Sequence, residues 1–305
     1  MKIIFMGTPS YATTILEALC HEDDIEVALL VTQQDKPVGR KQILTPPHTK
    51  AWILENGLSL EIYQPKTLRI AEAHEKIASL KPDFIIVAAY GQILPKEILD
   101  IAPCINLHAS LLPKYRGASP IQSSLLANDI YAGVTSMLME EGLDTGAMLG
   151  LSYLKIEDAS SSILFEKLAH IAAKLTLETL KNFNQLLPMQ QVDASSSHCK
   201  KIKKEDGLVS FEIQSAGEID TKFKALTPWP GLFLDSGLKL LDMQLISLTQ
   251  KGVQGTICAL HKEGVQIFCK EGVVMLKSVQ PFSKSAMNVL DYIRGKRLSV
   301  GDILV

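Results

Sequence analysis

The chain has 305 residues, of which 47% are hydrophobic and 21% are charged, and its formal net charge at pH 7 is −2. These values fit a globular protein with a proper hydrophobic core, built as one large or two ordinary domains. No apolar run reaches the roughly 18 residues that a membrane-spanning helix needs, so we expect no membrane span.

The cysteines and histidines exclude a disulfide framework and give no sign of a metal site. The five cysteines are Cys20, Cys104, Cys199, Cys258 and Cys269. They are scattered and form no Cys-x-x-Cys pair, which indicates reduced thiols in a cytosol. The seven histidines are equally scattered, with no pair at metal-ligand spacing, so we predict no metal. Residues 1 and 2 lead directly into the apolar residues 3–6, so we expect no signal or transit peptide and a cytoplasmic protein.

The charges are distributed unevenly along the chain. Residues 200–305 contain 15 basic and 11 acidic side chains, whereas the rest of the chain contains 16 basic and 22 acidic ones. A basic C-terminal part on an acidic body is consistent with an anionic partner, although many globular domains show such an imbalance by chance.

The N-terminal half alternates predicted strands and helices. Strands are predicted at 2–6, 26–31, 60–63 and 83–89, and helices at 11–19 and 71–80. This alternation predicts a mostly parallel, Rossmann-like sheet with right-handed crossovers. The first strand-to-helix turn, residues 7–10, lacks the spaced glycines of Gly-x-Gly-x-x-Gly and contains Pro9, so we predict no dinucleotide site.

A candidate catalytic triad lies in the middle of the chain. Residues 104–107 predict a buried strand, and Asn106 and His108 are two positions apart, so their side chains project from the same face. Residues 133–139 predict another strand, and the acidic turn after it carries Asp144. A carboxylate favours the charged imidazolium, and an imidazolium beside an amide gives two donors suited to an oxyanion. A single histidine near a strand end is nevertheless more often structural.

The positions of these residues support a site at one edge of the sheet. Tyr90 and Gly91 follow the fourth predicted strand, His108 the fifth and Asp144 the sixth. Ligands bind beyond the carboxyl ends of the strands in open parallel sheets. We therefore expect all of these residues to lie at the same edge.

The C-terminal part of the chain has a different pattern of predicted elements. Residues 161–184 predict a helix packed on the sheet, and the Ser-, Gln- and Lys-rich residues 190–206 predict a linker between a catalytic domain, 1–189, and a second domain, 207–305. Runs at 256–261, 265–270 and 273–279 are joined by Lys-Glu-Gly turns, which is typical of hairpins. We predict a small β domain of the oligonucleotide-binding barrel type, with a helix at 288–296.

Four sequence strings resemble the signature of the folate-dependent formyltransferases. They are Asn-x-His-x-Ser-Leu-Leu-Pro at 106–113, Tyr-Arg-Gly-Ala at 115–118, Gly-x-Asp-Thr-Gly at 142–146 and Pro-Trp-Pro-Gly at 228–231. The resemblance covers nearly the whole chain. Within that family it is closest to the members that act on initiator methionyl-tRNA.

The resemblance implies an enzyme that transfers the formyl group of 10-formyltetrahydrofolate to the α-amine of initiator methionyl-tRNA. Separately, we expect a monomer. Asn106 and protonated His108 would stabilise the oxyanion, and Asp144 would hold His108 charged and relay the proton of the amine. The folate-facing residues would be Ala88, Tyr90, Gly91, Ser110, Leu111, Leu112, Pro113 and Glu141. Leu111 and Leu112 could equally be ordinary core residues.

Two groups of residues are candidates for tRNA binding, the first through the resemblance and the second through its charge. The loop 33–49 would approach the acceptor arm with Lys36, Arg40 and Lys41. Lys200, Lys201, Lys203 and Lys204 would contact phosphates or would only form a solvated linker face. On the residues alone, both groups could be plain surface.

Other functions fit the sequence less well. Asp144-Thr-Gly and Asp235-Ser-Gly look like the paired motifs of aspartic proteases, but that fold is all-β. Ser110 or Ser119 as a hydrolase nucleophile lacks the Gly-x-Ser-x-Gly elbow. An RNA-binding module without catalysis would not need the triad. Formylation of another amine, such as a sugar nucleotide or glycinamide ribonucleotide, shares the chemistry and stays open.

Overall fold

The computed structural model describes residues 1–39 and 41–304 and divides the chain into two compact units. Unit 1 consists of Met1–Pro120, Ile130–Glu157 and Leu164–Lys200. Unit 2 consists of Ile121–Asp129, Asp158–Ile163 and the chain from Lys201 onwards. Because unit 1 continues to Lys200, most of the predicted linker 190–206 lies within this unit.

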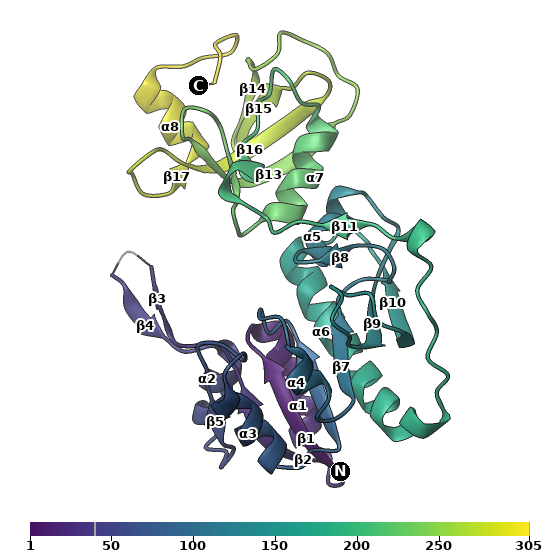
Figure 1. Cartoon of the computed structure of the whole chain (residues 1–305). Helices are drawn as coiled ribbons and strands as arrows, with labels where there is room; N and C mark the ends of the chain where they lie inside the picture. The colour runs from purple at the N-terminus through teal and green to yellow at the C-terminus, as the bar shows by residue number, and fades with distance from the viewer. Residues whose placement is uncertain (40, 305) are drawn as a thin grey trace. The chain divides into compact units, whose positions relative to one another are not determined.

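Unit 1 is built on a seven-stranded sheet (Figure 1). In spatial order its strands are β10 (Met148–Lys155), β9 (Tyr131–Leu138), β7 (Cys104–His108), β6 (Phe84–Ala88), β1 (Lys2–Gly7), β2 (Glu26–Val31) and β5 (Ile62–Tyr63). The strands from β7 to β5 pair in parallel, whereas β9 is antiparallel to β7 and β10 is antiparallel to β9. The predicted mostly parallel, Rossmann-like sheet is confirmed.

The direction of β9 corrects one expectation about the site. Leu138 at the carboxyl end of β9 pairs with Ile105 near the start of β7, so β9 ends at the edge of the sheet opposite to the ends of β6 and β7. The prediction that Asp144 lies beyond a parallel strand end is therefore wrong. Asp144 meets the β7 residues because the loop after β9 returns along the sheet, which a rule for parallel strands does not describe.

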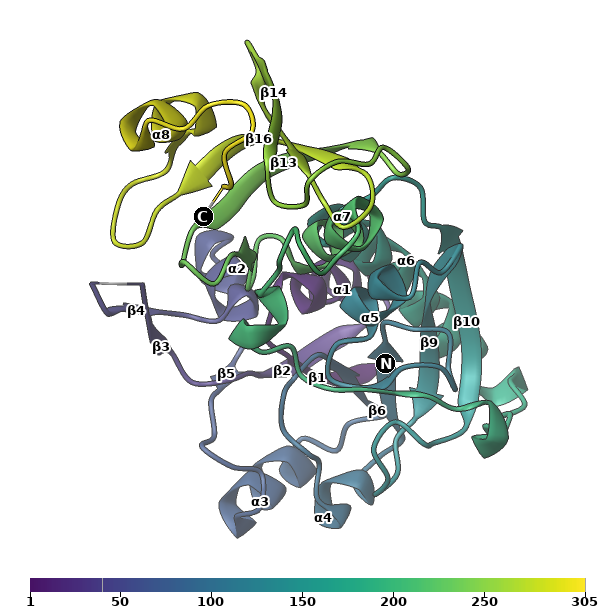
Figure 2. The same cartoon turned by 90° about the horizontal axis from the view of Figure 1, so that it is seen from above.

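Helices cover both faces of this sheet. Helices α1 (Ser10–Cys20) and α6 (Ser161–Asn182) lie on one face, and α3 (Ala71–Ser79) and α4 (Lys96–Leu99) lie on the other (Figure 2). The alternation of side chains along β1 feeds both cores, with Ile4 and Met6 packed in the cluster that includes Ala73, Ile77 and Ile98. Gly7 allows the β1–α1 turn to close tightly, since a Cβ there would meet Ala12 at 2.6 Å.

The segment that sequence predicts as a loop, 33–49, contains a small hairpin. Strands β3 (Lys36–Val38) and β4 (Ile43–Thr45) pair antiparallel and are followed by α2 (His48–Glu55). The hairpin extends away from the rest of unit 1 in both views (Figures 1 and 2). Its described residues are exposed, with Val38, Ile43 and Leu44 at 55%, 62% and 65% of their full accessibility.

Unit 2 is a small antiparallel β domain, as predicted. Its strands are β12 (Leu232–Phe233), β13 (Lys239–Ser247), β16 (Val273–Gln280), β15 (Gly264–Phe268) and β14 (Ile257–His261) in spatial order, and β17 (Met287–Asn288) pairs with β16. Its helices include α5 (Pro120–Leu126), α7 (Ala216–Leu226) and α8 (Val289–Lys296). Closure of this sheet into a barrel stays a prediction.

The described residues also bear on membranes and metals. Within residues 1–39 and 41–304, no helix is both long and apolar enough to cross a membrane. In the same part of the chain, no three His, Cys, Asp or Glu side chains come together in a group that could hold a metal ion.

Candidate active site

Strand β7 places Asn106 and His108 on the same face of the sheet, as their spacing predicts. Every residue of the strand is buried, because neighbours pair on both of its edges. The side chains of both residues reach Asp144 from the loop after β9. Asn106 is 9% exposed and His108 is 7% exposed, so the two groups lie where water screens charge poorly.

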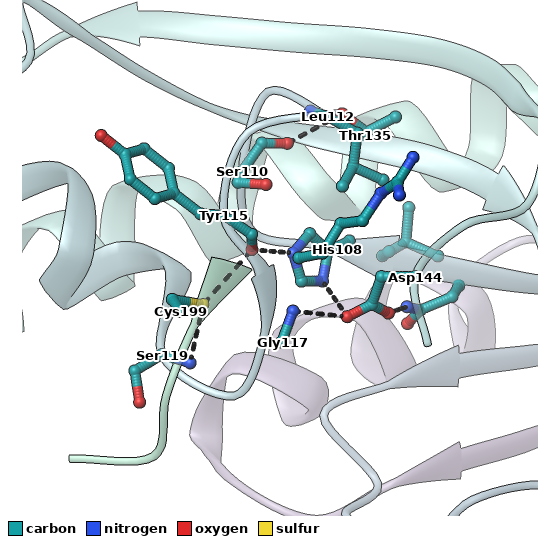
Figure 3. A network of polar contacts seen from close by, with 12 residues as sticks. His108, Ser110, Leu112, Tyr115, Gly117, Ser119, Thr135, Asp144 and Cys199 are labelled. Carbon is teal, nitrogen blue, oxygen red and sulfur yellow. Dashed lines mark hydrogen bonds and ion pairs between the residues drawn. The ribbon is translucent and has the colours of Figure 1, made fainter. Parts of the chain in front are cut away.

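Asp144 is the centre of the three predicted catalytic residues (Figure 3). Its Oδ1 accepts a long hydrogen bond from Asn106 Nδ2 at 3.4 Å, and its Oδ2 lies 3.7 Å from His108 Nδ1. The backbone N–H of Gly117 donates to Oδ2 at 2.8 Å. Only this last contact has a strong geometry, so the carboxylate is fixed by the backbone while both side-chain donors lie at the limit of direct contact.

The second nitrogen of His108 determines which tautomer is present. His108 Nε2 lies 2.8 Å from the carbonyl oxygen of Tyr115. A carbonyl can only accept, so Nε2 carries a hydrogen in both the neutral and the charged ring. In the neutral ring Nδ1 therefore has the lone pair, and in the charged ring Nδ1 is a second donor. Nδ1 therefore faces Asp144 across a gap that is too long for a direct hydrogen bond. A substrate oxygen or a water could bridge that gap.

The loop after β7 is held by polar contacts from β9. Thr135 Oγ1 donates to the carbonyl of Ser110 at 2.8 Å and accepts from the N–H of Leu112 at 3.1 Å. Ser110 Oγ donates to the carbonyl of Lys114 at 2.6 Å. Tyr115 has a positive φ of 59°, which turns its carbonyl toward His108. These hydrogen bonds fix the conformation of the loop that follows His108.

A second segment, residues 189–199, runs across this loop, and we call it the strap. Its strand β11 (His198–Cys199) pairs in parallel with β8 (Arg116–Gly117). Gly117 has φ +120°, and a Cβ there would overlap the carbonyl of Cys199, so only glycine fits. Cys199 Sγ also donates to the carbonyl of Tyr115 at 3.3 Å, the same oxygen that His108 contacts.

Further strap residues bind the loops that carry the triad. Ser197 Oγ accepts from the N–H of Tyr115 at 2.9 Å. The buried guanidinium of Arg116 donates to Gln191 and to Asp193, both at 2.9 Å. Sequence reasoning missed these partners, because a stretch rich in Gln and Ser is typical of a linker.

The predicted folate-facing residues lie in two settings. Gly91 and Glu141 are exposed in loops. Ala89, between Ala88 and Tyr90, is exposed as well, and both Ala89 and Gly91 have positive φ. The Tyr90 side chain is instead buried in the main core cluster, and burial raises the pKa of its phenol. Leu112 belongs to a buried cluster with two methionines, and Leu111 packs against Gly133.

These positions limit what the folate-facing residues could contribute. The Tyr90 and Leu112 side chains are buried, and part of their backbone is already paired. The carbonyl of Tyr90 accepts from Thr8 and Gln33, and the N–H of Leu112 donates to Thr135. Ala88 and Ser110 are buried as well, while Pro113 is half-buried.

The predicted tRNA-contacting lysines are all exposed. Lys36 lies on β3 and Lys41 follows in the turn of the hairpin. Arg40 lies outside the described residues. Lys200 ends unit 1, while Lys201, Lys203 and Lys204 belong to unit 2. A role in phosphate binding stays a prediction for each of them.

The cysteine on the strand that carries Asn106 and His108 is not activated as a nucleophile. Cys104, which begins β7, is 3% exposed, and its Sγ donates to the carbonyl of Ala102 at 3.4 Å. Burial raises the pKa of this thiol to about 12, so it stays protonated at neutral pH. The geometry suits stabilisation of an oxyanion beside a carboxylate, which serves acyl transfer to an amine without a covalent intermediate.

Comparisons with known proteins identify the family. A family model described as formyl transferase matches residues 1–180, and one described as formyl transferase, C-terminal domain, matches residues 201–297. The methionyl-tRNA formyltransferase of a Nitratiruptor species is 52% identical over 303 residues, 99% of each chain. The protein of that name from Campylobacter lari is 53% identical over 303 residues, again 99% of each chain.

Solved structures show the same fold at low sequence identity. The crystal structure of HypX from Aquifex aeolicus in complex with tetrahydrofolic acid is 16% identical and superposes with a TM-score of 0.66. It covers 98% of this chain, and this chain spans about half of it, 48%. The two family models and the full-length relatives agree along both units. The chain belongs to the formyl transferase family.

Proposed function

We propose that this chain transfers the formyl group of 10-formyltetrahydrofolate to the α-amino group of initiator methionyl-tRNA, giving N-formylmethionyl-tRNA for translation initiation. One observation carries the choice of acceptor: relatives named methionyl-tRNA formyltransferase are 52% and 53% identical along 99% of the chain. The basic surplus of residues 200–305 supports a polyanionic partner for unit 2.

The reaction replaces one amide bond by another. A bond forms between the α-nitrogen and the formyl carbon, and the bond from that carbon to N10 of the folate breaks. When bound, the folate supplies the formyl carbon and the leaving nitrogen. The protein therefore has to stabilise the negative oxygen of the tetrahedral intermediate and move one proton from the attacking amine to the leaving nitrogen.

Asn106 and His108 are suited to the oxygen. Asn106 Nδ2 and His108 Nδ1 both point to the space beside Asp144, at 3.4 and 3.7 Å from its two oxygens. An oxygen placed there would receive one N–H from each when the imidazole is charged. Loss of one such donor typically costs about 3 kcal/mol of transition-state stabilisation. The bond from Nε2 to Tyr115 keeps Nδ1 turned inward.

Asp144 is suited to the proton. Its side chain is 12% exposed, so it keeps access to a water, and its negative charge stabilises the imidazolium. As a carboxylate it can take the proton of the amine through that water and return it to the leaving nitrogen. The N–H of Gly117 holds the carboxylate in place during both steps.

The loops around the triad fit a folate. The exposed turn that contains Ala89 and Gly91, and the exposed loop that contains Glu141, offer backbone N–H and C=O groups. These are the groups that pair with the donor and acceptor edge of a pterin. A small number of fixed polar groups in a partly apolar setting is typical of such ligand sites.

A monomer in the cytoplasm is the corresponding proposal for the state of the protein. The triad and the strap come from one chain, so catalysis needs no second copy. Translation initiation takes place in the cytoplasm.

The test is single-turnover formyl transfer from 10-formyltetrahydrofolate, with initiator methionyl-tRNA, an amino-sugar nucleotide and glycinamide ribonucleotide as acceptors. We expect transfer to the tRNA alone. Transfer only to a small amine would refute the proposed acceptor while keeping the chemistry of the triad. Absence of transfer to any of them would refute the proposed reaction.

A further inference from the structure

We infer that Gln191, a residue of the strap outside the triad, is a positioning residue that holds the Asp144 carboxylate in its reactive place. This inference rests on the proposed function, since it assigns Gln191 a role in that reaction. Gln191 is half-buried, and within residues 1–39 and 41–304 its side chain forms three hydrogen bonds, all of them to residues around the carboxylate.

The backbone of Asp144 needs external support. Its φ is +53°, in the left-handed region. Aspartate adopts this region more often than most L residues, but it is still less favourable than right-handed or extended backbone. Such a residue persists when its surroundings over-determine its conformation. Gly146, two residues further on, is pressed against β9, since a Cβ there would overlap the carbonyl of Leu138. The turn is thus fixed on one side by close packing.

Gln191 fixes the other side of the turn. Its Nε2 donates to the carbonyl of Asp144 at 2.9 Å and to the carbonyl of Gly146 at 2.8 Å. Both hydrogens of the amide are therefore used on one turn. The residue itself is anchored two positions earlier, where Met189 exchanges backbone hydrogen bonds with Met148 at 2.8 and 2.9 Å.

The same side chain reaches the group that binds the carboxylate. Gln191 Oε1 accepts from Arg116 Nε at 2.9 Å, and the next residue, Gly117, donates its N–H to Asp144 Oδ2. One amide therefore joins the backbone that carries the carboxylate to the backbone that orients it. The reverse amide orientation would set an NH₂ against the guanidinium and an oxygen against two carbonyls, so the assignment is unambiguous.

This arrangement predicts a specific kinetic effect. The hydrogen bonds of Gln191 go to Arg116 and to the backbone of Asp144 and Gly146, so we expect its loss to leave substrate binding largely intact. Misplacement of a catalytic group by a fraction of an ångström lowers turnover, and we expect Gln191→Ala to lower kcat on the order of 10- to 100-fold while both KM values change less than about 3-fold.

The control is Gln190→Ala. Gln190 is the same residue type one position earlier, is exposed, and makes no side-chain hydrogen bond within residues 1–39 and 41–304. It should leave kcat and both KM values at the wild-type level.

A second control compares the single variant Asp144→Ala with the double variant Asp144→Ala, Gln191→Ala under single-turnover conditions. If Gln191 acts through Asp144, the double variant should be no slower than Asp144→Ala alone.

A further variant covers the case in which Gln191→Ala does not fold. Gln191→Glu has the same shape and keeps the acceptor for Arg116, but it places an oxygen against the carbonyls of Asp144 and Gly146. It should lose at least as much kcat as Gln191→Ala while folate binding remains. A wild-type kcat in Gln191→Glu, or losses that multiply in the double variant, would overturn the role of Gln191.

Failure of this inference can be told from failure of the proposed function. The acceptor that wild-type protein formylates tests the function, whereas the ratio of each variant to wild type, measured on that acceptor, tests Gln191. A ratio near one for Gln191→Ala with active wild-type protein refutes only the positioning role.

Discussion

The loop after β7 and the β3–β4 hairpin are two segments of unit 1 with opposite construction. Around β7, the polar groups of His108, Ser110 and Asp144 are buried or nearly so and have fixed partners. In the hairpin, apolar side chains such as Ile43 and Leu44 are more than half exposed.

The base of the hairpin is nevertheless fixed. Lys50 Nζ donates to both oxygens of Asp35, at 2.9 and 2.8 Å, and to Gln64 Oε1 at 2.8 Å. Hydrogen bonds from Gln64 and then from Lys50 lower the pKa of the Asp35 carboxyl. The hairpin is thus a firmly attached arm with an exposed apolar surface.

We propose that the difference reflects two physical tasks. Acyl transfer needs donors that are aligned before the reaction, because realignment during the reaction would add to the barrier. Binding a large polyanion needs basic and apolar side chains that remain accessible until the partner covers them. Exposed apolar side chains on a hairpin are unfavourable without such a partner.

The largest effect on turnover is expected from substitutions in the buried catalytic triad. His108→Ala and Asp144→Ala should each lower kcat on the order of 10²- to 10³-fold, because an oxyanion donor or the group that supports it is lost. Folate affinity, measured by equilibrium titration, should change much less. Wild-type turnover in either variant would remove that residue from the mechanism.

Substitutions in the exposed β3–β4 hairpin should change the affinity for tRNA. Replacing Val38, Ile43 and Leu44 with serine should weaken methionyl-tRNA binding roughly tenfold, about 1.4 kcal/mol, because the bound tRNA would cover these side chains. The fold should be unaffected, because the same side chains are exposed in the free protein. Single-turnover rate at saturating tRNA should stay close to wild type. A filter-binding or fluorescence titration that shows unchanged tRNA affinity would return the hairpin to plain surface.

The role of the lysines at 200, 201, 203 and 204 can be tested through the salt dependence of tRNA affinity. If each contacts a phosphate, replacing all four with alanine should flatten the plot of log affinity against log salt by up to about 0.9 per lost contact. Folate affinity serves as the internal control. An unchanged slope would show that these lysines only solvate their own segment.

The smallest effect concerns the capping box of α7 in unit 2. Ser215 Oγ accepts from the N–H of Glu218 at 3.2 Å, and the N–H of Ser215 donates to Glu218 Oε2 at 2.7 Å. Ser215→Ala should cost about 1 kcal/mol of the free energy of unfolding, measured by thermal melts, with formyl transfer unchanged.

This effect should depend on pH. The hydrogen bonds of Ser215, its N–H first and then its hydroxyl, lower the pKa of Glu218 in the folded chain. The folded value lies below the unfolded one, so the contribution is complete above the unfolded value and is lost as the pH falls through the folded value. Ser215→Ala removes only the hydroxyl and keeps the backbone N–H, so the difference between wild type and Ser215→Ala should shrink in acid by the part that the hydroxyl bond to Glu218 contributes. A difference that does not change with pH would contradict this origin.

Local patterns in the sequence predicted much of the fold and the centre of the site. Apolar strands alternating with helices predicted the sheet of unit 1, and the Lys-Glu-Gly turns predicted the hairpins of unit 2. The spacing of Asn106 and His108 placed both side chains on one face because the period of a strand is two. The capping box Ser-x-x-Glu at 215–218 was an available signal for α7 that sequence reasoning did not use.

Only the tertiary structure decided the rest. The antiparallel direction of β9, the return of the loop that carries Asp144 and the contacts of the strap involve partners far apart in the chain. The bonds of Gln191 span 45 to 75 residues, and no local periodicity marks a residue whose partners are that distant. Sequence by itself determined which chemical groups are present and which face of a strand they occupy, since these follow from backbone geometry over a few residues. Their separation, tautomer and support depend on how distant segments pack, and that is a property of the whole fold.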